Sequence, residues 1–139
     1  MKIINVKLSG SGEMPTKATE GSAGYDLYAP ERVILYPMSY ECIDLGVSIE
    51  LPKRTCGIIS HRSGLNSKYG VFAYGLIDSD YRGSLKVTLF NFNDSPMVLE
   101  KGDRIAQLKI EEIPQVTLRL TEELTETQRG DKGHGSTGM

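Results

Sequence analysis

The chain has 139 residues, 39% of them hydrophobic and none of them tryptophan, which is enough for one domain with its own core. Its 16 basic and 18 acidic residues give a net charge of -2, which argues against the basic face of a nucleic-acid binder. No stretch approaches the roughly 18 apolar residues of a membrane span, and residues 1–15 lack the apolar run of a secretory signal. We therefore expect an intracellular protein, cytoplasmic or, if viral, nuclear in its host, without nucleic-acid or membrane partners.

Short runs of strand-forming residues, separated by glycine, proline and other turn residues, predict an all-β barrel or sandwich. The expected strands, in chain order, are residues 2–8, 32–36, 42–51, 55–60, 84–92, 96–100 and 104–113. Only residues 62–70 favour a helix, of two turns at most, with a serine near the start and a glycine at the end. Cys42 and Cys56 match no metal-ligand spacing, so we expect two reduced thiols in the core.

The C-terminal region differs from the rest of the chain in composition. Residues 121–128 (TEELTETQ) are equally compatible with a helix and with an exposed, extended arm. Residues 130–139 include four glycines, and only the terminal methionine is large and apolar, so this segment cannot fold alone. Its composition is typical of a floppy tail, yet its many N–H and O–H donors would also suit a ligand rich in phosphate.

Five segments combine polar side chains with turn residues. In AGYDLYA (23–29), Asp26 is typical of a carboxylate that caps a turn. In HRSGLN (61–66), Arg62 and Ser63 precede the expected helix, where free N–H groups and a guanidinium would attract an anion. The alternative for this second segment is a serine helix cap beside a surface arginine.

The third segment, GLIDSDYRGSL (75–85), places Asp78 at a strand end near the core, where a carboxylate can act as a base, and Asp80 in a turn. A metal site or an acidic hairpin turn are alternatives. In KGDRIAQL (101–108), Arg104 and Gln107 need partners within an apolar strand, unless that strand is an edge strand with outward polar residues. In RGDKGHGSTG (129–138), Arg129 could clamp a phosphate.

Together and in this order, the five segments closely resemble the five motifs of the trimeric dUTPase family (deoxyuridine 5'-triphosphate nucleotidohydrolase), over about residues 15–138. The resemblance implies a β jelly roll with one short helix in residues 1–120. It also implies a homotrimer in which residues 121–139 form a flexible arm that closes over a neighbouring subunit's active site. The implied reaction cuts dUTP to dUMP and pyrophosphate, which keeps uracil out of DNA and supplies dUMP for dTMP synthesis.

The resemblance also implies roles for individual residues. Asp78 would deprotonate the attacking water, Gln107 would hold that water, and Asp26 would support the site through hydrogen bonds. Mg²⁺ would supply positive charge while held by substrate phosphates and waters, without direct protein ligands. The implied substrate-binding residues are Arg62, Ser63 and Gly64 for phosphate, Phe72, Gly75, Leu76 and Ile77 around uracil, Tyr81 against deoxyribose, Lys86, and Arg129, His134, Gly135 and Ser136 of the arm.

His134 departs from the family pattern, because most family tails carry there a phenylalanine that stacks on uracil. The smaller, more polar imidazole implies weaker substrate affinity or closure that depends on pH.

Other activities are also compatible with the fold. A dCTP deaminase would need a pocket glutamate, which residues 75–85 lack. A non-catalytic interaction protein is disfavoured by the intact Asp78, Gln107 and Arg129, while a regulatory protein partner beside catalysis stays open, because surface loops could bind it. A capsid-like protein would not need the five motifs.

Overall fold

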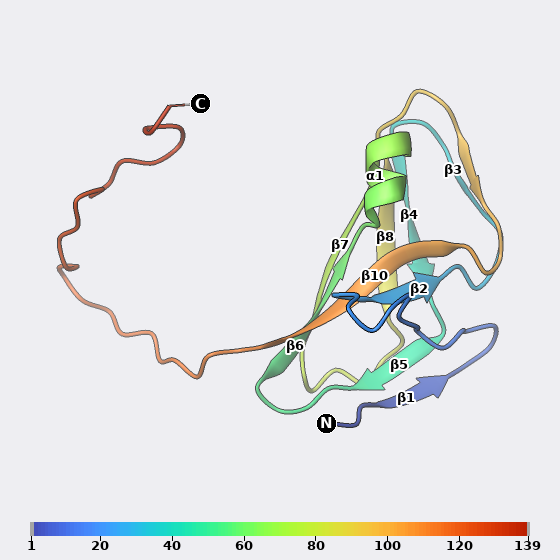
Figure 1. Ribbon diagram of the computed structural model, residues 1–139, viewed down its shortest axis with the longest axis horizontal. Coiled ribbons are helices and arrows are strands. Elements are labelled where there is room, and N and C mark those ends of the chain that lie inside the picture. The colour runs from blue at the N-terminus through green and yellow to red at the C-terminus, as the bar shows by residue number, and fades with distance from the viewer. Residues whose placement is uncertain (1, 139) are drawn as a thin grey trace.

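The computed structural model describes residues 2–138. Met1, which begins the expected range 1–120, and Met139, which ends the expected range 121–139, lie outside the described residues. The described chain is built from strands and one short helix (Figure 1), which confirms the predicted all-β class. The elements are β1 (Asn5–Leu8), β2 (Tyr25–Tyr28), β3 (Val33–Leu35), β4 (Ser39–Asp44), β5 (Val47–Glu50), β6 (Thr55–Ser60), α1 (Ser63–Tyr69), β7 (Val71–Ile77), β8 (Lys86–Asn91), β9 (Met97–Leu99) and β10 (Arg104–Glu112).

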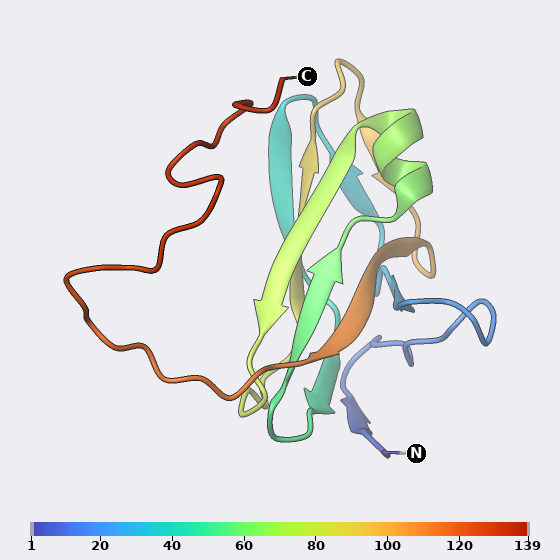
Figure 2. The same cartoon turned by 60° about the vertical axis from the view of Figure 1, so that its left-hand side comes forward.

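The strands form a curled six-stranded sheet in the order β2-β10-β6-β7-β8-β4, with all neighbours antiparallel. Two two-stranded sheets, β1-β5 and β3-β9, flank it near opposite ends of the molecule (Figures 1 and 2). Neighbours such as β2 and β10 are far apart in sequence, so long connections carry the chain between the sheets. This arrangement is the predicted jelly-roll-like architecture.

Alternating side chains place one apolar cluster inside the curled sheet. On β8, Val87 and Leu89 are buried while Lys86 and Phe90 face outward. Leu27, Ile59 and Leu108 extend the same cluster onto β2, β6 and β10.

The alternation of strand β4 corrects one expectation about the cysteines. Ile43 of β4 points into the core, so its neighbour Cys42 points outward and is exposed. Cys56 on β6 is buried as expected, and both thiols are free. The prediction of two core thiols is therefore wrong for Cys42, because which of two adjacent strand residues faces inward depends on how the sheet packs.

The bounds of two expected segments, the strand 42–51 and the helix 62–70, differ in the structure because of glycine and cap conformations. The run 42–51 is split into β4 and β5 because Gly46 adopts a φ of 65°, and its N–H donates to Asp44 Oδ1 at 3.0 Å. The helix begins at Ser63 after Arg62, which occupies the cap position without a side-chain cap bond, so the serine-cap alternative is wrong. It ends at Gly70, with a φ of 62°. Within residues 2–138, no helix has the length and apolar character to cross a membrane.

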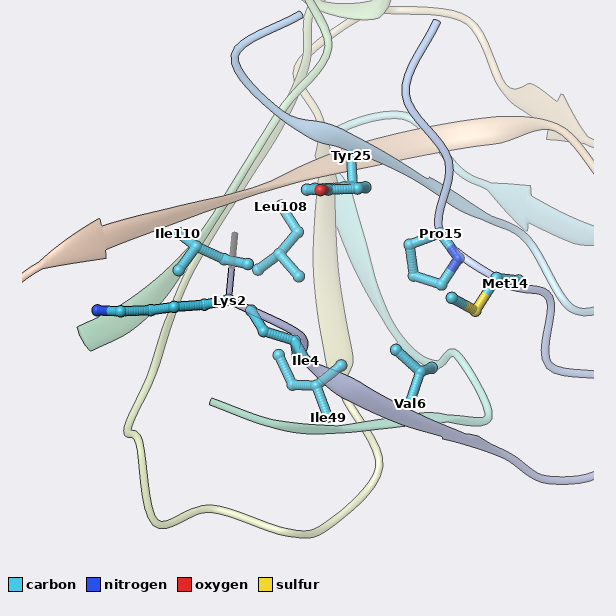
Figure 3. A pocket seen from close by; sticks show the side chains of 9 residues that line it. All are labelled: Lys2, Ile4, Val6, Met14, Pro15, Tyr25, Ile49, Leu108 and Ile110. Carbon is cyan, nitrogen blue, oxygen red and sulfur yellow. The ribbon is translucent and has the colours of Figure 1, made fainter. Parts of the chain in front are cut away.

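The C-terminal segment leaves the body after β10 and runs away from it as an extended arm (Figures 1 and 2). Residues 121–128 contain no helix, which confirms the extended alternative. Every residue from Glu111 to Gly138 is exposed, including Val116, Leu118 and Leu120 at 76%, 94% and 99%. Near the start of the arm, an apolar cavity of about 180 Å³ opens between β1, β5 and β10 (Figure 3).

Candidate active site

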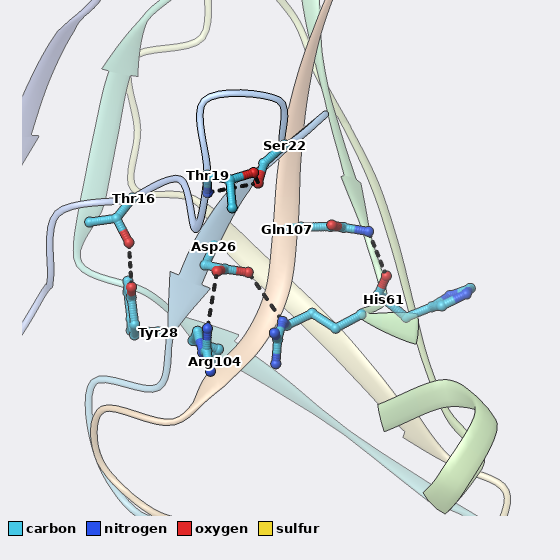
Figure 4. A network of polar contacts seen from close by, with 9 residues as sticks. Thr16, Thr19, Ser22, Asp26, Tyr28, His61, Arg104 and Gln107 are labelled. Atoms are coloured by element: carbon cyan, nitrogen blue, oxygen red, sulfur yellow. Dashed lines mark hydrogen bonds and ion pairs between the residues drawn. The ribbon is translucent and has the colours of Figure 1, made fainter. Parts of the chain in front are cut away.

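Asp26 lies within strand β2, where it is only 8% exposed, so the turn-cap interpretation is wrong. The Nε of Arg62 donates to Asp26 Oδ1 at 3.1 Å, and the Nη1 of Arg104 lies 3.7 Å from Oδ2 (Figure 4). Both carboxylate oxygens are therefore occupied by guanidinium groups from other elements. A largely buried carboxylate is tolerable when opposite charges compensate its desolvation in this way.

Gln107 lies on β10 in the same row of the sheet as Asp26. The register pairs Gln107 with Asp26 on one side and with Ser60 on the other. Its Nε2 donates to the carbonyl of His61 at 3.1 Å, which fixes the direction of the amide (Figure 4). Because β10 lies between β2 and β6, the edge-strand alternative for this segment is wrong. We call Asp26, Arg62, Arg104 and Gln107 the arginine–aspartate cluster.

A second group of predicted residues surrounds a cavity of about 180 Å³ at the end of β7, here called the hairpin pocket. Asp78 directly follows β7, which confirms the expected strand end, but its side chain is exposed rather than near the core. Asp80 lies exposed in the next turn, as predicted. The pocket is lined by Leu76, Ile77, Asp78, Tyr81 and Lys86.

The loop between β7 and β8 holds Tyr81 through its own backbone. The Tyr81 hydroxyl donates to the carbonyl of Ser84 at 2.9 Å, and its N–H donates to the carbonyl of Asp78 at 3.2 Å. The ring lies against Gly83, where an added Cβ would come within 2.4 Å of the Tyr81 hydroxyl. Glycine is thus the residue that lets the ring occupy this place.

Strand β7 changes partner halfway along its length, which leaves part of one backbone edge free. Residues Val71–Ala73 pair with β8, while residues 74–77 pair with β6. In the part of the chain that the structure describes, Gly75, Leu76 and Ile77 have no ladder partner on the β8 side. Phe72 instead sits in the paired half opposite Phe90, and its ring contacts His61 edge-on at 5.2 Å between centroids.

The arginine–aspartate cluster and the hairpin pocket do not meet within one chain. Asp26, Gln107, Ser60 and Tyr74 form one row across the sheet. Asp78 lies four residues beyond Tyr74, which is about 13 Å along the strand. Strand β2 is three strands away from β7 in the sheet order, which adds about 14 Å across it. One chain therefore presents two separate half-sites.

The predicted residues of the arm lie apart from both half-sites (Figures 1 and 2). Arg129, Gly135 and Ser136 are exposed and sit in short turns, such as the one closed by the Ser136 N–H donating to the Gly133 carbonyl at 3.2 Å. His134 is also exposed and adopts a φ of 50°. Ser63 and Gly64 start helix α1 beside Arg62, and both are exposed.

Sequence reasoning assigned no role to Asp44 and Ser84. The Ser84 hydroxyl donates to Asp44 Oδ1, and Lys86 of the hairpin pocket pairs with Asp44 across the ladder. These contacts hold the pKa of the Asp44 carboxyl below its ordinary value of 3.8, chiefly through the Ser84 hydroxyl and then the Gly46 N–H, with Lys86 contributing. The spacing of Asp44 and Gly46 is typical of a side-chain-supported turn, which was the available signal.

The described chain is thus an all-β protein with a curled jelly-roll fold and a pocket at the end of β7 that contains one acid and one lysine. A family model described as dUTPase matches residues 11–138. The chain therefore belongs to the dUTPase family.

Individual relatives agree with this assignment. The chain is 44% identical to a deoxyuridine 5'-triphosphate nucleotidohydrolase of Paramecium bursaria Chlorella virus 1, over 96% of this chain and 95% of that protein. It is 43% identical to a probable enzyme of the same name from Schizosaccharomyces pombe, over the full length of both.

Solved structures show the same fold. The dUTPase of Staphylococcus bacteriophage 80alpha with dUPNHPP superposes with a TM-score of 0.94 at 30% identity, and the match covers 100% of both chains. A dUTPase variant from phage phi11 of S. aureus, described with a structural Mg(II) ion, has a TM-score of 0.81 at 27% identity, covering 88% of this chain and 98% of that one.

Proposed function

We propose that this protein hydrolyses dUTP to dUMP and pyrophosphate in sites shared between the subunits of a homotrimer. The observation that carries the proposal is the hairpin pocket, which gathers an acid, an aromatic ring and a lysine at the end of β7. Relatives of that name at 43% and 44% identity over nearly the whole chain support it. The reaction would keep uracil out of DNA and supply dUMP for dTMP synthesis.

Uracil would be read by the free backbone edge of β7 at Gly75, Leu76 and Ile77. Backbone N–H and C=O groups have fixed positions, so they can match the donors and acceptors of one base. The hairpin pocket opens beside this edge, at Leu76 and Ile77. Phe72 would act only at the edge of this region, because its backbone belongs to the half of β7 that is paired with β8.

Asp78 would accept a proton from a water molecule that attacks the α-phosphorus, and pyrophosphate would leave in line with the attack. Its exposed side chain at the mouth of the hairpin pocket is open to such a water. Gln107 would orient that water, because its Nε2 is held by His61 and its oxygen remains available as an acceptor. Asp26 would support the site by holding Arg62 and Arg104 in place.

The triphosphate would contact Arg62, Ser63 and Gly64 from one side and Lys86, Arg129, Gly135 and Ser136 from others. Arg62 uses its Nε for Asp26, which leaves the two terminal nitrogens for phosphate oxygens. Tyr81 would pack on deoxyribose and exclude a 2'-hydroxyl by steric conflict.

The separation of the two half-sites supports a shared site. Because Asp78 and Gln107 lie on different parts of one chain, a second copy would bring its hairpin pocket to the arginine–aspartate cluster. The arm, residues 121–139, would come from a third copy. Residues 114–138 can span about 80 Å when extended, which is enough to reach a neighbour. Val116, Leu118 and Leu120, in the exposed segment between β10 and the arm, favour packing of that segment on another chain, where the cavity of Figure 3 offers apolar surface.

Mg²⁺ would reach this site bound to the triphosphate. Residues 2–138 contain no group of three or more acidic, histidine or cysteine side chains that could hold a metal, and both Asp26 oxygens face arginines. Such a site suits an ion that arrives on the triphosphate and keeps water ligands. Bound there, the ion would neutralise charge on the phosphates.

The central test is pyrophosphate release by purified protein with Mg²⁺ and each of dUTP, dTTP, dCTP and UTP. We expect release from dUTP alone, abolished in Asp78→Asn. Release of ammonia from dCTP with formation of dUTP would favour the deaminase alternative. A folded trimer inactive on all four substrates would contradict the proposal and favour an interaction protein with a regulatory partner.

Mixing two inactive variants tests whether the site is shared between subunits. In trimers formed at random from equal amounts of Asp78→Asn and Arg62→Ala chains, about a quarter of the active sites should be intact. Each site needs an intact Asp78 from one chain and an intact Arg62 from another, and each is present with a chance of about one half. Asp78→Asn mixed with Asp78→Asn is the matched control. A mixture that stays inactive after subunit exchange, confirmed by native mass spectrometry, would show that each site lies within one chain.

Substituting His134→Phe tests the departure in the arm. The larger, less polar ring should lower KM for dUTP by about threefold to tenfold, because aromatic stacking contributes roughly 0.5–1.5 kcal/mol. Steady-state kinetics at several pH values between 6 and 8 would measure this. Equal KM values for the two proteins across that range would contradict an effect of His134 on closure.

A further inference from the structure

Asp44 lies at the end of β4, outside every residue assigned to the reaction above. Its Oδ1 accepts hydrogen bonds from the hydroxyl of Ser84 and from the N–H of Gly46, the latter at 3.0 Å. Opposite Asp44 in the ladder is Lys86, which lines the hairpin pocket. One carboxylate therefore connects the turn after β4 to the final residues of the loop that carries Tyr81.

From Ser84 the contacts continue to the aromatic ring of the pocket. The Ser84 carbonyl accepts the hydroxyl of Tyr81 at 2.9 Å. The adjacent Gly83 allows the ring to lie against the backbone, since an added Cβ would be 2.4 Å from the Tyr81 hydroxyl. Asp44, Ser84 and Tyr81 thus form a continuous series of hydrogen bonds.

The buried anchor of the loop lies on the C-terminal side of Ser84, while Arg82 on the other side makes an exposed ion pair with Glu50 at 3.9 Å. Leu85 is fully buried, donates to the Val47 carbonyl at 2.7 Å and accepts from the Leu45 N–H at 2.9 Å. Residues 80–83, in contrast, are exposed. The hydroxyl of Ser84 is the side-chain contact that extends this anchor toward Tyr81.

We propose that Asp44 and Ser84 are positioning residues that hold the Tyr81 ring in the hairpin pocket and so set the preference for deoxyribose over ribose. This inference rests on the proposed function, in which Tyr81 packs on the sugar. The contacts act through ring placement, because neither Asp44 nor Ser84 is among the residues that line the pocket. Their loss should therefore affect sugar selection more than the chemical step.

The test compares Ser84→Ala with wild type, since this change removes the hydroxyl and leaves the Asp44–Gly46 bond intact. Ser95→Ala is the matched control, because its hydroxyl also donates to an aspartate, Asp94, in a turn remote from the pocket. We expect Ser84→Ala to lower the ratio of kcat/KM for dUTP over UTP about fivefold, the worth of one hydrogen bond. The change should lie in KM, with kcat unchanged and Tm lowered only by the loss of one hydrogen bond.

Further variants distinguish the loss of the Ser84–Asp44 hydrogen bond from a general increase in the mobility of the loop. Ser84→Thr should restore the wild-type ratio, and Asp44→Ala combined with Ser84→Ala should lower it no further than either change alone. Hydrogen exchange measured by mass spectrometry should be faster over residues 79–84 in Ser84→Ala and unaltered in Ser95→Ala.

The outcomes distinguish this inference from the proposed function. A wild-type protein that does not hydrolyse dUTP overturns the proposed function, and hydrogen exchange then decides whether Ser84 holds the loop. If wild type is active, an unchanged dUTP to UTP ratio in Ser84→Ala overturns the positioning role, even where exchange is faster. If hydrogen exchange over residues 79–84 in Ser84→Ala stays at the wild-type rate, the Ser84 hydroxyl does not hold the loop and the inference is overturned.

Discussion

At the scale of single residues, Asp26 shows how a charge is accommodated within a small β protein. Its side chain is 12% exposed, while that of Arg62 is 30% exposed, so the pair is shielded but not dry. The pair joins residues 36 positions apart, on β2 and at the start of α1. Asp26 thereby ties together two of the segments that sequence alone left separate.

Replacing Asp26 by asparagine keeps the shape and removes the charge between two arginines. We expect the free energy of unfolding to fall by about 1–3 kcal/mol, because Arg62 and Arg104 lose their common partner. The kcat/KM for dUTP should fall at least about tenfold as Arg62 shifts. Urea unfolding and steady-state kinetics would measure both, with Asp94→Asn in an exposed turn as control; wild-type values in both assays would contradict the role of Asp26.

The lowered pKa of Asp44 predicts how the stability of the protein changes with pH. Its pKa is lowered on folding, so its contribution to stability is complete at neutral pH and is lost as pH falls below the ordinary value of 3.8 through the folded value. Between pH 6 and pH 3, Asp44→Asn should therefore lose less stability than wild type. Urea midpoints at the two pH values would show this, and equal losses in the two proteins would contradict it.

At the scale of elements, backbone hydrogen bonds from the N-terminal loop also hold the turn that follows Asp44. The N–H of Ser9 donates to the Gly46 carbonyl at 2.9 Å, and the N–H of Gly12 donates to the Ser9 carbonyl at 2.9 Å. A Cβ at Gly12 would come within 2.0 Å of the Gly46 carbonyl oxygen. The N-terminal loop thus packs directly on the turn between β4 and β5, which in turn fixes the loop of the hairpin pocket.

Substituting Gly12→Ala should force these two backbones apart. We expect a loss of about 1–3 kcal/mol in the free energy of unfolding, as is usual when atoms are added to a packed contact. Chemical denaturation would measure it. Gly21→Ala, where the added Cβ would meet nothing within 4 Å, is the control and should leave stability nearly unchanged.

At the scale of the whole molecule, a well-packed body is followed by a C-terminal segment that is not packed against it. The body encloses one apolar cluster, while the chain from Glu111 to Gly138 is exposed throughout. Catalysis as proposed needs both parts, the body for the two half-sites and the arm to cover the phosphates. Stability and activity should therefore separate when the arm is removed.

A chain that ends at Leu120 should remain folded with an unchanged Tm, because the removed residues contribute nothing to the core. Its kcat/KM for dUTP should fall about 100-fold, since the arm would no longer align and cover the substrate. Calorimetry, native mass spectrometry and pyrophosphate release would test this together. Activity near that of the full chain would contradict the proposed role of residues 121–139.

The candidate site was predicted unevenly. Asp78 and Tyr81 of the third segment line one pocket with the adjacent Lys86, because a hairpin places residues close in sequence side by side. Arg104 was recognised only as needing a partner, and Asp44 and Ser84 were missed. Those contacts join positions 40 or more residues apart, and no spacing rule specifies which of several arginines or serines meets a given carboxylate.

The sequence by itself determined the all-β class, residues 55–60 as a strand, the helix that ends at Gly70, and the order of the five segments, because alternation and glycine conformations are local. Only the tertiary structure decided that Asp26 lies in a strand, that Gly46 divides one run into two, and that β7 changes partner after Ala73. These features depend on backbone pairing between distant segments, whose energy is shared across the whole sheet.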